Sequence, residues 1–463
     1  MREYGDPVKH VVGRTFRNAY RLTVVGQPID RVCRGRRSMV AFSRKAGRLH
    51  RGRSALARQP CTAHDPGMDP DLVHQGLPPL LTPDFYRYPY PVYSALRTHD
   101  PVHWDEEHQV WVLTRYADVA AALVNPRLVR GAEEITIETD DPLRRVLSRM
   151  MLFSEPPRHT RLRSLVNRAF TPRRIDGMRP RIQTIVDQLL ERIGGRRDLD
   201  LIADLAYPLP VIVISEMLSL PRGDMDQFKR WSDDVIAYSA GAIDTEDRAR
   251  TSVTGLLTFF KELVSRLRSQ PDDTIMSALV EAESAGSRLD DEELLANAIL
   301  LLMNGHETTT DIIGNGVYAL LQNPDQLEKL QKQPELIVSA TEEMMRYDGA
   351  VQLRGVSAAQ EVTIGGKQIA SGQTVYMVIG AANRDGEQFS EPDRFDIERS
   401  PNRHLEFGNG IHFCVGAALA RAEAQIAISS LLARFPDLEL GSDWLEWKSI
   451  PVFRGLKSLP IHV

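Results

Sequence analysis

The residue that is best placed to do chemistry is a cysteine in a glycine-rich loop, residues 407–416, which read FGNGIHFCVG. The loop brings Cys414 to the start of a predicted helix over residues 417–434, where the helix N-terminus and backbone N–H groups stabilise a thiolate. Glycines let a large flat group approach the main chain. A lone cysteine is most often a small buried apolar residue, and a nucleophile needs a base and an orienting group. His412 is near, but no acyl-transfer motif accompanies it.

A second polar group interrupts an otherwise apolar stretch at residues 304–311, which read NGHETTTD. Acidic residues at 290–293 predict a helix start, and helical character continues over residues 294–321, about 42 Å at the usual rise. Asn304 and Thr308 share one face, with a glycine between them. Buried polar groups and glycine destabilise a helix interior, so this face indicates a function. The alternative is a kinked helix whose hydroxyls are satisfied locally.

The elements that position these two groups are mostly helical. Short β-branched and aromatic stretches at 102–104 and 110–114 predict a hairpin that leads into a helix over residues 117–123. A second small sheet is predicted from residues 362–364, 368–369 and 375–379. Apolar residues at three-to-four spacing predict further helices over residues 160–170, 179–192, 209–218, 224–237, 246–267 and 334–346. The predicted fold class is therefore mainly α with small β-sheets (α+β).

The 463 residues carry a net charge of −5, but the charge is unevenly distributed. Residues 1–67 hold 15 of the 57 lysines and arginines and only 4 of the 62 acidic residues, which predicts a basic, disordered N-terminal arm. Nucleic-acid binding, a transit peptide, an inert tail and a start wrongly placed upstream of Met68 are the alternatives for this arm. Residues 68–463 are predicted to form one catalytic domain.

Composition narrows the class of protein. A hydrophobic content of 42% is typical of a globular chain with a large core. No stretch approaches the roughly 18 apolar residues of a membrane-spanning helix. Three cysteines spread along the chain cannot form a disulfide framework or a clustered zinc site. This cysteine usage favours a protein located in the reducing cytoplasm. We expect a monomer with no membrane and no nucleic-acid partner.

The loop at residues 407–416 resembles the ligand loop of the cytochrome P450 family, the haem-thiolate monooxygenases, whose pattern is F-G-x-G-x-H/R-x-C-x-G. Further matches follow in the expected order over nearly all of residues 75–463. Glu343 and Arg346 match the family's E-x-x-R, a structural ion pair with Arg394 as its expected third member. The resemblance implies the cytochrome P450 fold of the soluble bacterial type, with a long central helix over a buried haem.

The resemblance also implies which residues hold the cofactor, haem b (iron protoporphyrin IX). Cys414 would ligate the iron from a loop that includes Phe407 and Gly408. His159 and Arg163, four residues apart on one helix face, suit the haem propionates.

Two further propionate contacts are implied. His412 would meet a propionate from the other side. Many bacterial members place an arginine about ten residues after the E-x-x-R arginine, where this chain has Val356. Arg354 lies two residues earlier, on the same face of a strand, and is the expected substitute.

For catalysis, the resemblance implies that Gly305 leaves room for dioxygen, that Thr308 holds a proton-relaying water and that Glu307 connects this relay to solvent. His306 falls at a variable position and is interpreted as packing only. Asn304 replaces the usual Ala or Gly. It could donate to dioxygen, bind a polar substrate group, or tie the kinked helix to its neighbour.

The implied reaction inserts one oxygen atom from O2 into a small, largely apolar organic substrate by hydroxylation or epoxidation. The chain has no dinucleotide-binding glycine motif, no cysteine cluster for iron–sulfur and no length for a flavin domain. Electrons are therefore expected from a separate ferredoxin or flavodoxin with its reductase. A basic docking face including Arg421 and Arg168 is a further hypothesis.

Substrate identity is not predicted, and terpenoids, polyketides, fatty acids and macrolide-like molecules fit equally well. By resemblance, the pocket is lined by residues 131–151, 224–251 and 350–353, the long helix, and residues 452–453. Two alternatives to the monooxygenase are a peroxide-driven peroxygenase and a non-catalytic haem-binding or docking module. Retention of Glu307 and Thr308 argues against both.

Overall fold

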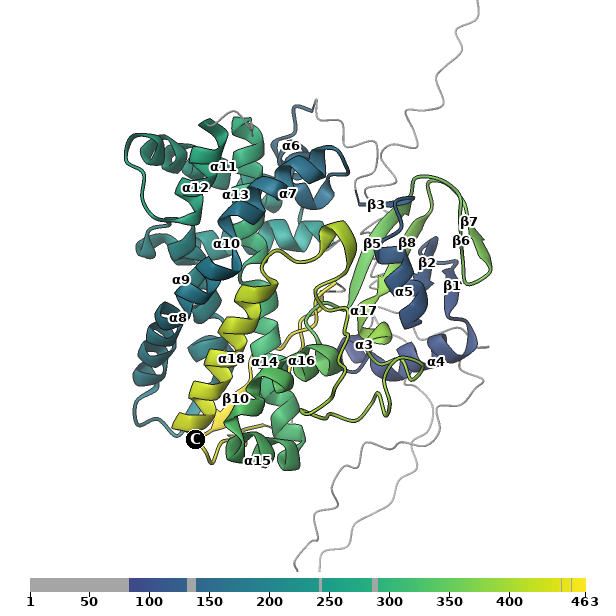
Figure 1. The fold of residues 1–463 in the computed structure, drawn as a ribbon, viewed down its shortest axis with the longest axis vertical. Coiled ribbons are helices and arrows are strands. Elements are labelled where there is room, and N and C mark those ends of the chain that lie inside the picture. The colour runs from purple at the N-terminus through teal and green to yellow at the C-terminus, as the bar shows by residue number, and fades with distance from the viewer. Residues whose placement is uncertain (1–82, 131–138, 241–243, 285–289, 443, 451) are drawn as a thin grey trace, which may run out of the picture.

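The computed structural model describes residues 83–130, 139–240, 244–284, 290–442, 444–450 and 452–463. The predicted basic arm, residues 1–67, lies outside these residues. Most helices gather on one side of the molecule and the largest sheet lies on the other, with α14 and α18 between them (Figure 1). Among the described residues, none of the helices combines the length and the apolar character that crossing a membrane requires.

The largest sheet has five strands in the order β1-β2-β8-β5-β3. The predicted hairpin is confirmed as β1 (Val102–Asp105) and β2 (Val110–Leu113). The predicted second sheet is wrong in part. β8 (Thr374–Val378) pairs with β2 and with β5 (Leu353–Ala358), while β6 and β7 form a separate hairpin. All five residues of β8 are buried, and a strand buried on both faces belongs at the centre of a sheet.

The remaining strands are short. The hairpin consists of β6 (Val362–Ile364) and β7 (Lys367–Ile369), and β3 (Leu128–Val129) closes the edge of the large sheet. A three-stranded sheet has the order β4-β10-β9, from Asp198–Asp200, Pro460–His462 and Glu439–Leu440.

The helices predicted from apolar spacing are confirmed, with ends that differ by a few residues. They are α5 (Tyr116–Leu123), α7 (Arg158–Ala169), α8 (Pro172–Ile193), α9 (Pro208–Met217), α10 (Met225–Ser239), α11 (Glu246–Ser269), α16 (Ile337–Asp348) and α18 (Ala417–Arg434). The structure adds α3 (Pro83–Arg87), α4 (Tyr90–His99), α6 (Pro142–Arg149), α12 (Ile275–Ser284), α15 (Pro324–Lys332) and α17 (Ile379–Ala382).

The predicted long helix is broken in the middle. Its first half is α13 (Asp291–Asn304), which starts with a capping box between Asp290 and Glu293, and its second half is α14 (Glu307–Gln322). Around the break, side chains form hydrogen bonds with main-chain carbonyls. The amide of Asn304 donates to Leu300 O at 3.1 Å, and Nδ1 of His306 lies 2.9 Å from Leu302 O.

Gly305 lies at this break because a side chain does not fit there. A Cβ on Gly305 would lie 2.7 Å from Leu301 O and 2.7 Å from a side-chain carbon of Ile214. The expectation of one continuous helix was wrong, because α13 ends at Asn304 and α14 begins at Glu307. The break lies within the polar segment 304–311.

The E-x-x-R pair is fully buried, with Arg346 Nε 2.7 Å from Glu343 Oε2. Its third member is Arg399, whose Nε is 3.1 Å from the same carboxylate. The expectation of Arg394 was wrong, because its exposed side chain pairs with Glu391 and only its carbonyl accepts from Arg346. Glu343 pairs with both arginines, and main-chain carbonyls accept further N–H groups of Arg346, so each charge of this cluster has a partner.

Candidate functional site

A cavity lies between the broken helix and the cysteine loop, and its space, part of it open to solvent, amounts to about 1170 Å³. Its walls are mainly apolar, with polar groups at the rim and at the break. The structure brings all but one of the predicted site residues to this cavity: Cys414, His159, Arg163, Arg354, His412, Phe407, Gly408, Gly305 and Thr308. The exception, Glu307, follows Gly305 by two residues at the start of α14.

The loop before α18 presents the Cys414 thiol to this cavity. The Cys414 N–H donates to Phe407 O at 2.9 Å, which closes the loop on itself. Gly408 has φ +71°, a conformation that residues with a side chain rarely adopt. Burial raises the pKa of the Cys414 thiol, while the Gly416 N–H, Arg354 and Arg163 oppose this rise. A metal cation at the thiol would reverse that balance, because a coordinating thiol is deprotonated.

Two histidines of the cavity wall lie against each other. The rings of His159 and His412 have centroids 4.4 Å apart, and His412 Nε2 is 3.7 Å from the Glu155 carboxylate. Burial lowers the pKa of His159 to about 4 and also lowers the pKa of His412. His159 Nδ1 and His412 Nε2 are buried without a hydrogen-bond partner among the described residues. Buried polar atoms normally have partners, so these two nitrogens fit an acceptor group of a bound molecule.

Together these residues fit haem b. The cavity has apolar walls for a flat macrocycle and a thiol at one face. Arg163 and Arg354 line the same cavity as the histidine pair and bring two positive charges to it. Two cations suit the two propionate carboxylates of haem b. The predicted ligand set is thus brought together in one place.

The same cavity is lined by Gly305 and Thr308 of the helix break. The Thr308 hydroxyl has no hydrogen-bond partner within the described part of the chain, so it is available to a water or a ligand. Glu307 does have a partner. Lys448 Nζ lies 2.8 Å from Glu307 Oε1 and 2.7 Å from Asp311 Oδ1, and so links two carboxylates.

Lys448 and Asp311 were not predicted as site residues. Burial raises the pKa of Asp311 to about 8, although Lys448 opposes the rise. Lys448 comes from a loop 141 residues after Glu307, so no local pattern could link them. The only signal was a second acid, Asp311, one helical turn after Glu307.

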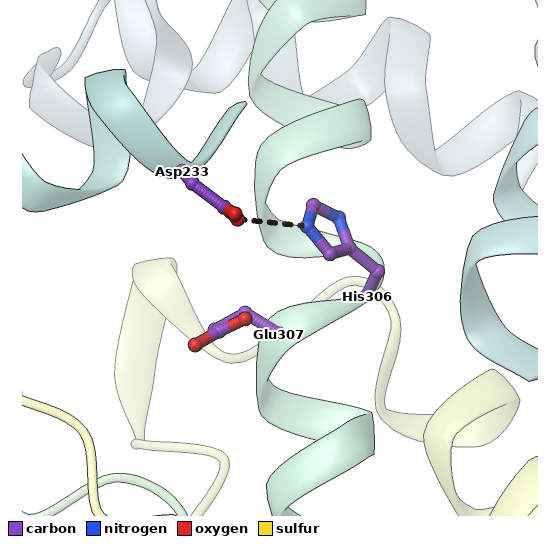
Figure 2. Close-up of side chains that lie close together, drawn as sticks. All are labelled: Asp233, His306 and Glu307. Carbon is purple, nitrogen blue, oxygen red and sulfur yellow. Dashed lines mark ion pairs between the residues drawn. The ribbon is translucent and has the colours of Figure 1, made fainter. Parts of the chain in front are cut away.

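The interpretation of His306 as packing only was incomplete. Its side chain is 2% exposed, and its Nε2 points toward Asp233 of α10 at 4.0 Å, with Glu307 beside them (Figure 2). Nδ1 bonds to a carbonyl and must therefore carry a proton. His306 thus belongs to a polar cluster that connects the helix break to the half-exposed Asp233.

Two other polar residues differ from expectation. Arg421 bonds twice to Glu342, at 2.6 and 2.7 Å, and its guanidinium lies 4.4 Å from the centre of the Phe407 ring. It supports the loop and is not a free docking cation, whereas Arg168 is exposed as the docking hypothesis needs. Glu406, which was not predicted, lines the cavity, and burial raises its pKa to about 8.

A smaller chamber of about 660 Å³ adjoins the main cavity and shares Asn304, Leu300 and Arg354 with it. The predicted lining regions contribute Met150, Ile236, Leu353, Val452 and Phe453. Residues 131–138 and 241–243 of the predicted lining lie outside the described residues. Asn304 donates to Leu300 O of its own helix, so the described residues do not show the tie to a neighbouring helix that was one of the three expectations. Asn304 also lines both chambers.

Comparison with known proteins agrees with the resemblance to the cytochrome P450 family. The family model described as Cytochrome P450 matches residues 213–442. Cytochrome P450 107B1 of Saccharopolyspora erythraea is 45% identical over 76% of this chain and 89% of its own. Vitamin D(3) 25-hydroxylase of Pseudonocardia autotrophica is 42% identical over 82% and 95%.

Solved structures that are similar to this chain are also cytochromes P450. The myxobacterial cytochrome P450 CYP267B1, in complex with myristic acid, has a TM-score of 0.78 and 38% identity over 84% of this chain and 99% of its own. The identities and coverage are far above what a shared fold alone would give, and the ligand loop lies at the expected cavity. The chain therefore belongs to the cytochrome P450 family, the monooxygenases that use haem b.

Proposed function

We propose that Cys414 is the iron ligand and that His159, Arg163, Arg354 and His412 hold the two haem propionates. The observation that carries this proposal is that one cavity is lined both by Cys414 and by the helix break at Gly305 and Thr308. His159 Nδ1 and His412 Nε2 support it, because neither makes a hydrogen bond among the described residues and propionate oxygens could accept from them. Phe407 and Gly408 shape the loop that aims the thiol, and Gly305 keeps space open at the helix break.

Haem b bound through a cysteine thiolate activates dioxygen for insertion of one oxygen atom into an organic molecule. The other oxygen atom leaves as water, which consumes two protons and two electrons. In our proposal, Thr308 holds the water that delivers these protons to the cavity, and Glu307 supplies them from solvent. Lys448 positions Glu307 by holding one of its carboxylate oxygens at 2.8 Å.

In this proposal the enzyme is monomeric and cytoplasmic, and its electrons come from a separate ferredoxin or flavodoxin. That electron carrier is reduced by its own reductase and docks onto the enzyme. The smaller chamber is lined mainly by apolar side chains among the described residues. In this proposal it holds the substrate, a small organic molecule that is hydroxylated or epoxidised. Vitamin D3 is a reasonable first probe, since a relative at 42% identity is named as its 25-hydroxylase.

The test is turnover of vitamin D3 and a panel of apolar molecules under two conditions. The first supplies isotopically labelled dioxygen, ferredoxin, ferredoxin reductase and NADPH, and the second supplies hydrogen peroxide alone. A monooxygenase yields labelled product only in the first condition. Equal product with peroxide alone favours the peroxygenase, and haem binding without product in either condition favours the non-catalytic module.

A further inference from the structure

His306, at the helix break, has one ring nitrogen that none of the described residues satisfies. Its Nδ1 donates to Leu302 O at 2.9 Å, so in the neutral ring Nε2 carries a lone pair. Nε2 is buried without a hydrogen-bond partner among the described residues and points toward Asp233 of α10, 4.0 Å away (Figure 2). A lone pair and a carboxylate that face each other are complementary only when one of them carries a proton. The pair is therefore suited to hold an exchangeable proton.

The polar cluster of Asp233, His306 and Glu307 leads from the surface of α10 to the helix break. Polar atoms of the three side chains lie within 4.8 Å of one another. The side chain of Asp233 is 40% exposed, whereas those of His306 and Glu307 are 2% and 12% exposed. Since Nε2 of His306 is closed to solvent, a proton can reach it only from a neighbouring side chain. Asp233 is the member of the cluster with open access to solvent.

Two lysines flank this cluster and determine what the gap between its acids can hold. Lys229 Nζ lies 2.6 Å from Asp233 Oδ2, and Lys448 Nζ lies 2.8 Å from Glu307 Oε1. Each carboxylate thus already has a positive partner, so a proton fits between them better than a divalent cation does. Burial acts to lower the pKa of Lys448, but Asp311 and Glu307 outweigh burial and raise that pKa, so Lys448 keeps its proton. An imidazole, in contrast, takes up and releases protons near neutral pH.

We infer that His306 takes up protons from solvent through Asp233 and passes them to Glu307. The inference rests on the proposed function, in which Glu307 feeds the water held by Thr308, and adds to it the route by which Glu307 regains its proton. His306 acts through Glu307 and is therefore a positioning residue for the proton, not a catalytic residue.

Each step of this route moves one proton and no electrons. A buffer acid or hydronium ion at the surface gives a proton to Asp233, which gives it to His306 Nε2 and so forms the imidazolium. Nε2 then gives a proton to the Glu307 carboxylate, which has lost its own proton to the water at Thr308. Nδ1 stays protonated throughout, because it donates to Leu302 O. The 4.0 Å between Nε2 and Asp233 Oδ1 exceeds a hydrogen bond by about 1 Å, which rotation of the partly exposed Asp233 side chain can close.

The titratable groups that face His306 come from the elements packed against it. They are Asp233, Asp226 and Lys229 of α10, Tyr207 beside α9, Glu307 of α14, and Lys448 of the C-terminal loop. Burial raises the pKa of Tyr207, so its hydroxyl stays neutral. Replacement of Asp233 therefore removes both the entry point of the route and one of the charges that stabilise an imidazolium.

The first experiment observes the proton on the ring. The haem-loaded protein, in its diamagnetic ferrous carbonyl form and with nitrogen-15-labelled histidine, is titrated by NMR from about pH 5.5 to 9, the range in which imidazoles titrate. The ring signals that His306→Gln removes identify His306. We expect Nε2 to gain a proton as pH falls while Nδ1 keeps its own. In Asp233→Asn the midpoint should drop by about half a pH unit or more, because an acid beside the ring is lost.

The second experiment measures the supply of protons during turnover. Oxygen consumption is followed with ferredoxin, its reductase, NADPH and vitamin D3, in water and in deuterium oxide. His306→Gln keeps an N–H donor for Leu302 O but has no titratable nitrogen. This variant and Asp233→Asn should lower kcat about tenfold, less than the roughly hundredfold of a group that acts on the reacting atoms directly, and should leave KM unchanged. Their solvent isotope effect should be larger than that of the native protein, and the deficit should grow with pH as free protons become scarcer.

Two matched controls lie outside the route. Asp234→Asn changes the next residue of α10, whose carboxylate accepts from Ser252 Oγ at 2.7 Å. His462→Gln changes an exposed histidine that pairs with Asp198. Both controls should keep the native kcat and solvent isotope effect.

The inference is overturned if Nε2 of His306 keeps its lone pair over the whole pH range, or if both variants keep the native kcat and solvent isotope effect. Haem content and the ferrous carbonyl spectrum show that each sample has folded, and the surface change Asp233→Asn decides the test if His306→Gln fails to bind haem. A native protein that turns over while both variants match it rejects the inference alone. A native protein that consumes no oxygen with NADPH, or that lacks the red-shifted Soret band, rejects the proposed function.

Discussion

Replacement of Lys448 by methionine should destabilise the protein by about 3 kcal/mol at neutral pH. Lys448 is 16% exposed and holds Glu307 and Asp311, which are 12% and 0% exposed. Removal of one member of a buried ion pair costs about 3–5 kcal/mol, because the partner charge stays buried without compensation. We expect the lower end of this range, since Asp311, with a pKa of about 8, can stay neutral by keeping a proton.

The pH dependence of this loss gives a sharper test. A carboxyl whose pKa is higher in the folded than in the unfolded state costs stability as pH rises from the unfolded to the folded pKa. In the native protein that loss ends near pH 8, the pKa of Asp311. Without Lys448 the pKa of Asp311 rises further, so the loss continues. The gap between native and Lys448→Met should widen by about 1.4 kcal/mol for each pH unit above 8.

The assay is urea unfolding of the haem-loaded protein at several pH values between 6 and about 9.5, the range over which Asp311 titrates. Lys457→Met is the matched control, because Lys457 forms an exposed pair with Glu446 and such pairs contribute roughly 0–1 kcal/mol. A loss under about 1 kcal/mol for Lys448→Met, or a gap that stays constant with pH, would refute the assigned ion pair.

Three further predictions concern Thr308, the N-terminal arm and Glu406. Thr308→Ala should leave haem and ligand binding nearly unchanged but divert electrons to peroxide, measured as product formed per NADPH consumed; an unchanged ratio would count against the proposed relay. A chain that starts at Met68 should keep its haem content, and its stability should change by less than about 0.5 kcal/mol, because a strongly basic arm without apolar periodicity has no core to join. Glu406→Gln should gain stability over the native protein as pH rises from about 5 to 8, by up to about 1.4 kcal/mol per unit, because burial raises the pKa of Glu406 to about 8 and its ionised form is disfavoured in the folded state; parallel stability curves for the two proteins would show that Glu406 does not titrate there.

The parts of the site that follow from local sequence were predictable. The loop at residues 407–416 and the helix Ala417–Arg434 lie where the glycine pattern and apolar spacing place them. His159 and Arg163 face the cavity together because they are four residues apart on one helix.

The parts that depend on tertiary packing were not predictable. The break at Gly305 depends on Ile214, which comes from a different helix and leaves no room for a Cβ. The choice of Arg399 over Arg394 depends on which side chain turns inward after the chain has folded. Lys448 reaches Glu307 from a distant loop, so neither spacing nor composition could assign it.

The central claim is that Cys414 ligates the haem iron, and the ferrous carbonyl spectrum tests it most directly. The native protein should show the red-shifted Soret band of a thiolate ligand, Cys414→His should lose it, and the combined Cys33→Ser and Cys61→Ser variant should retain it. Cys414 is the one cysteine in residues 68–463, so no other thiol of that region could replace it. A Cys414→His protein that kept the red-shifted band would contradict the account.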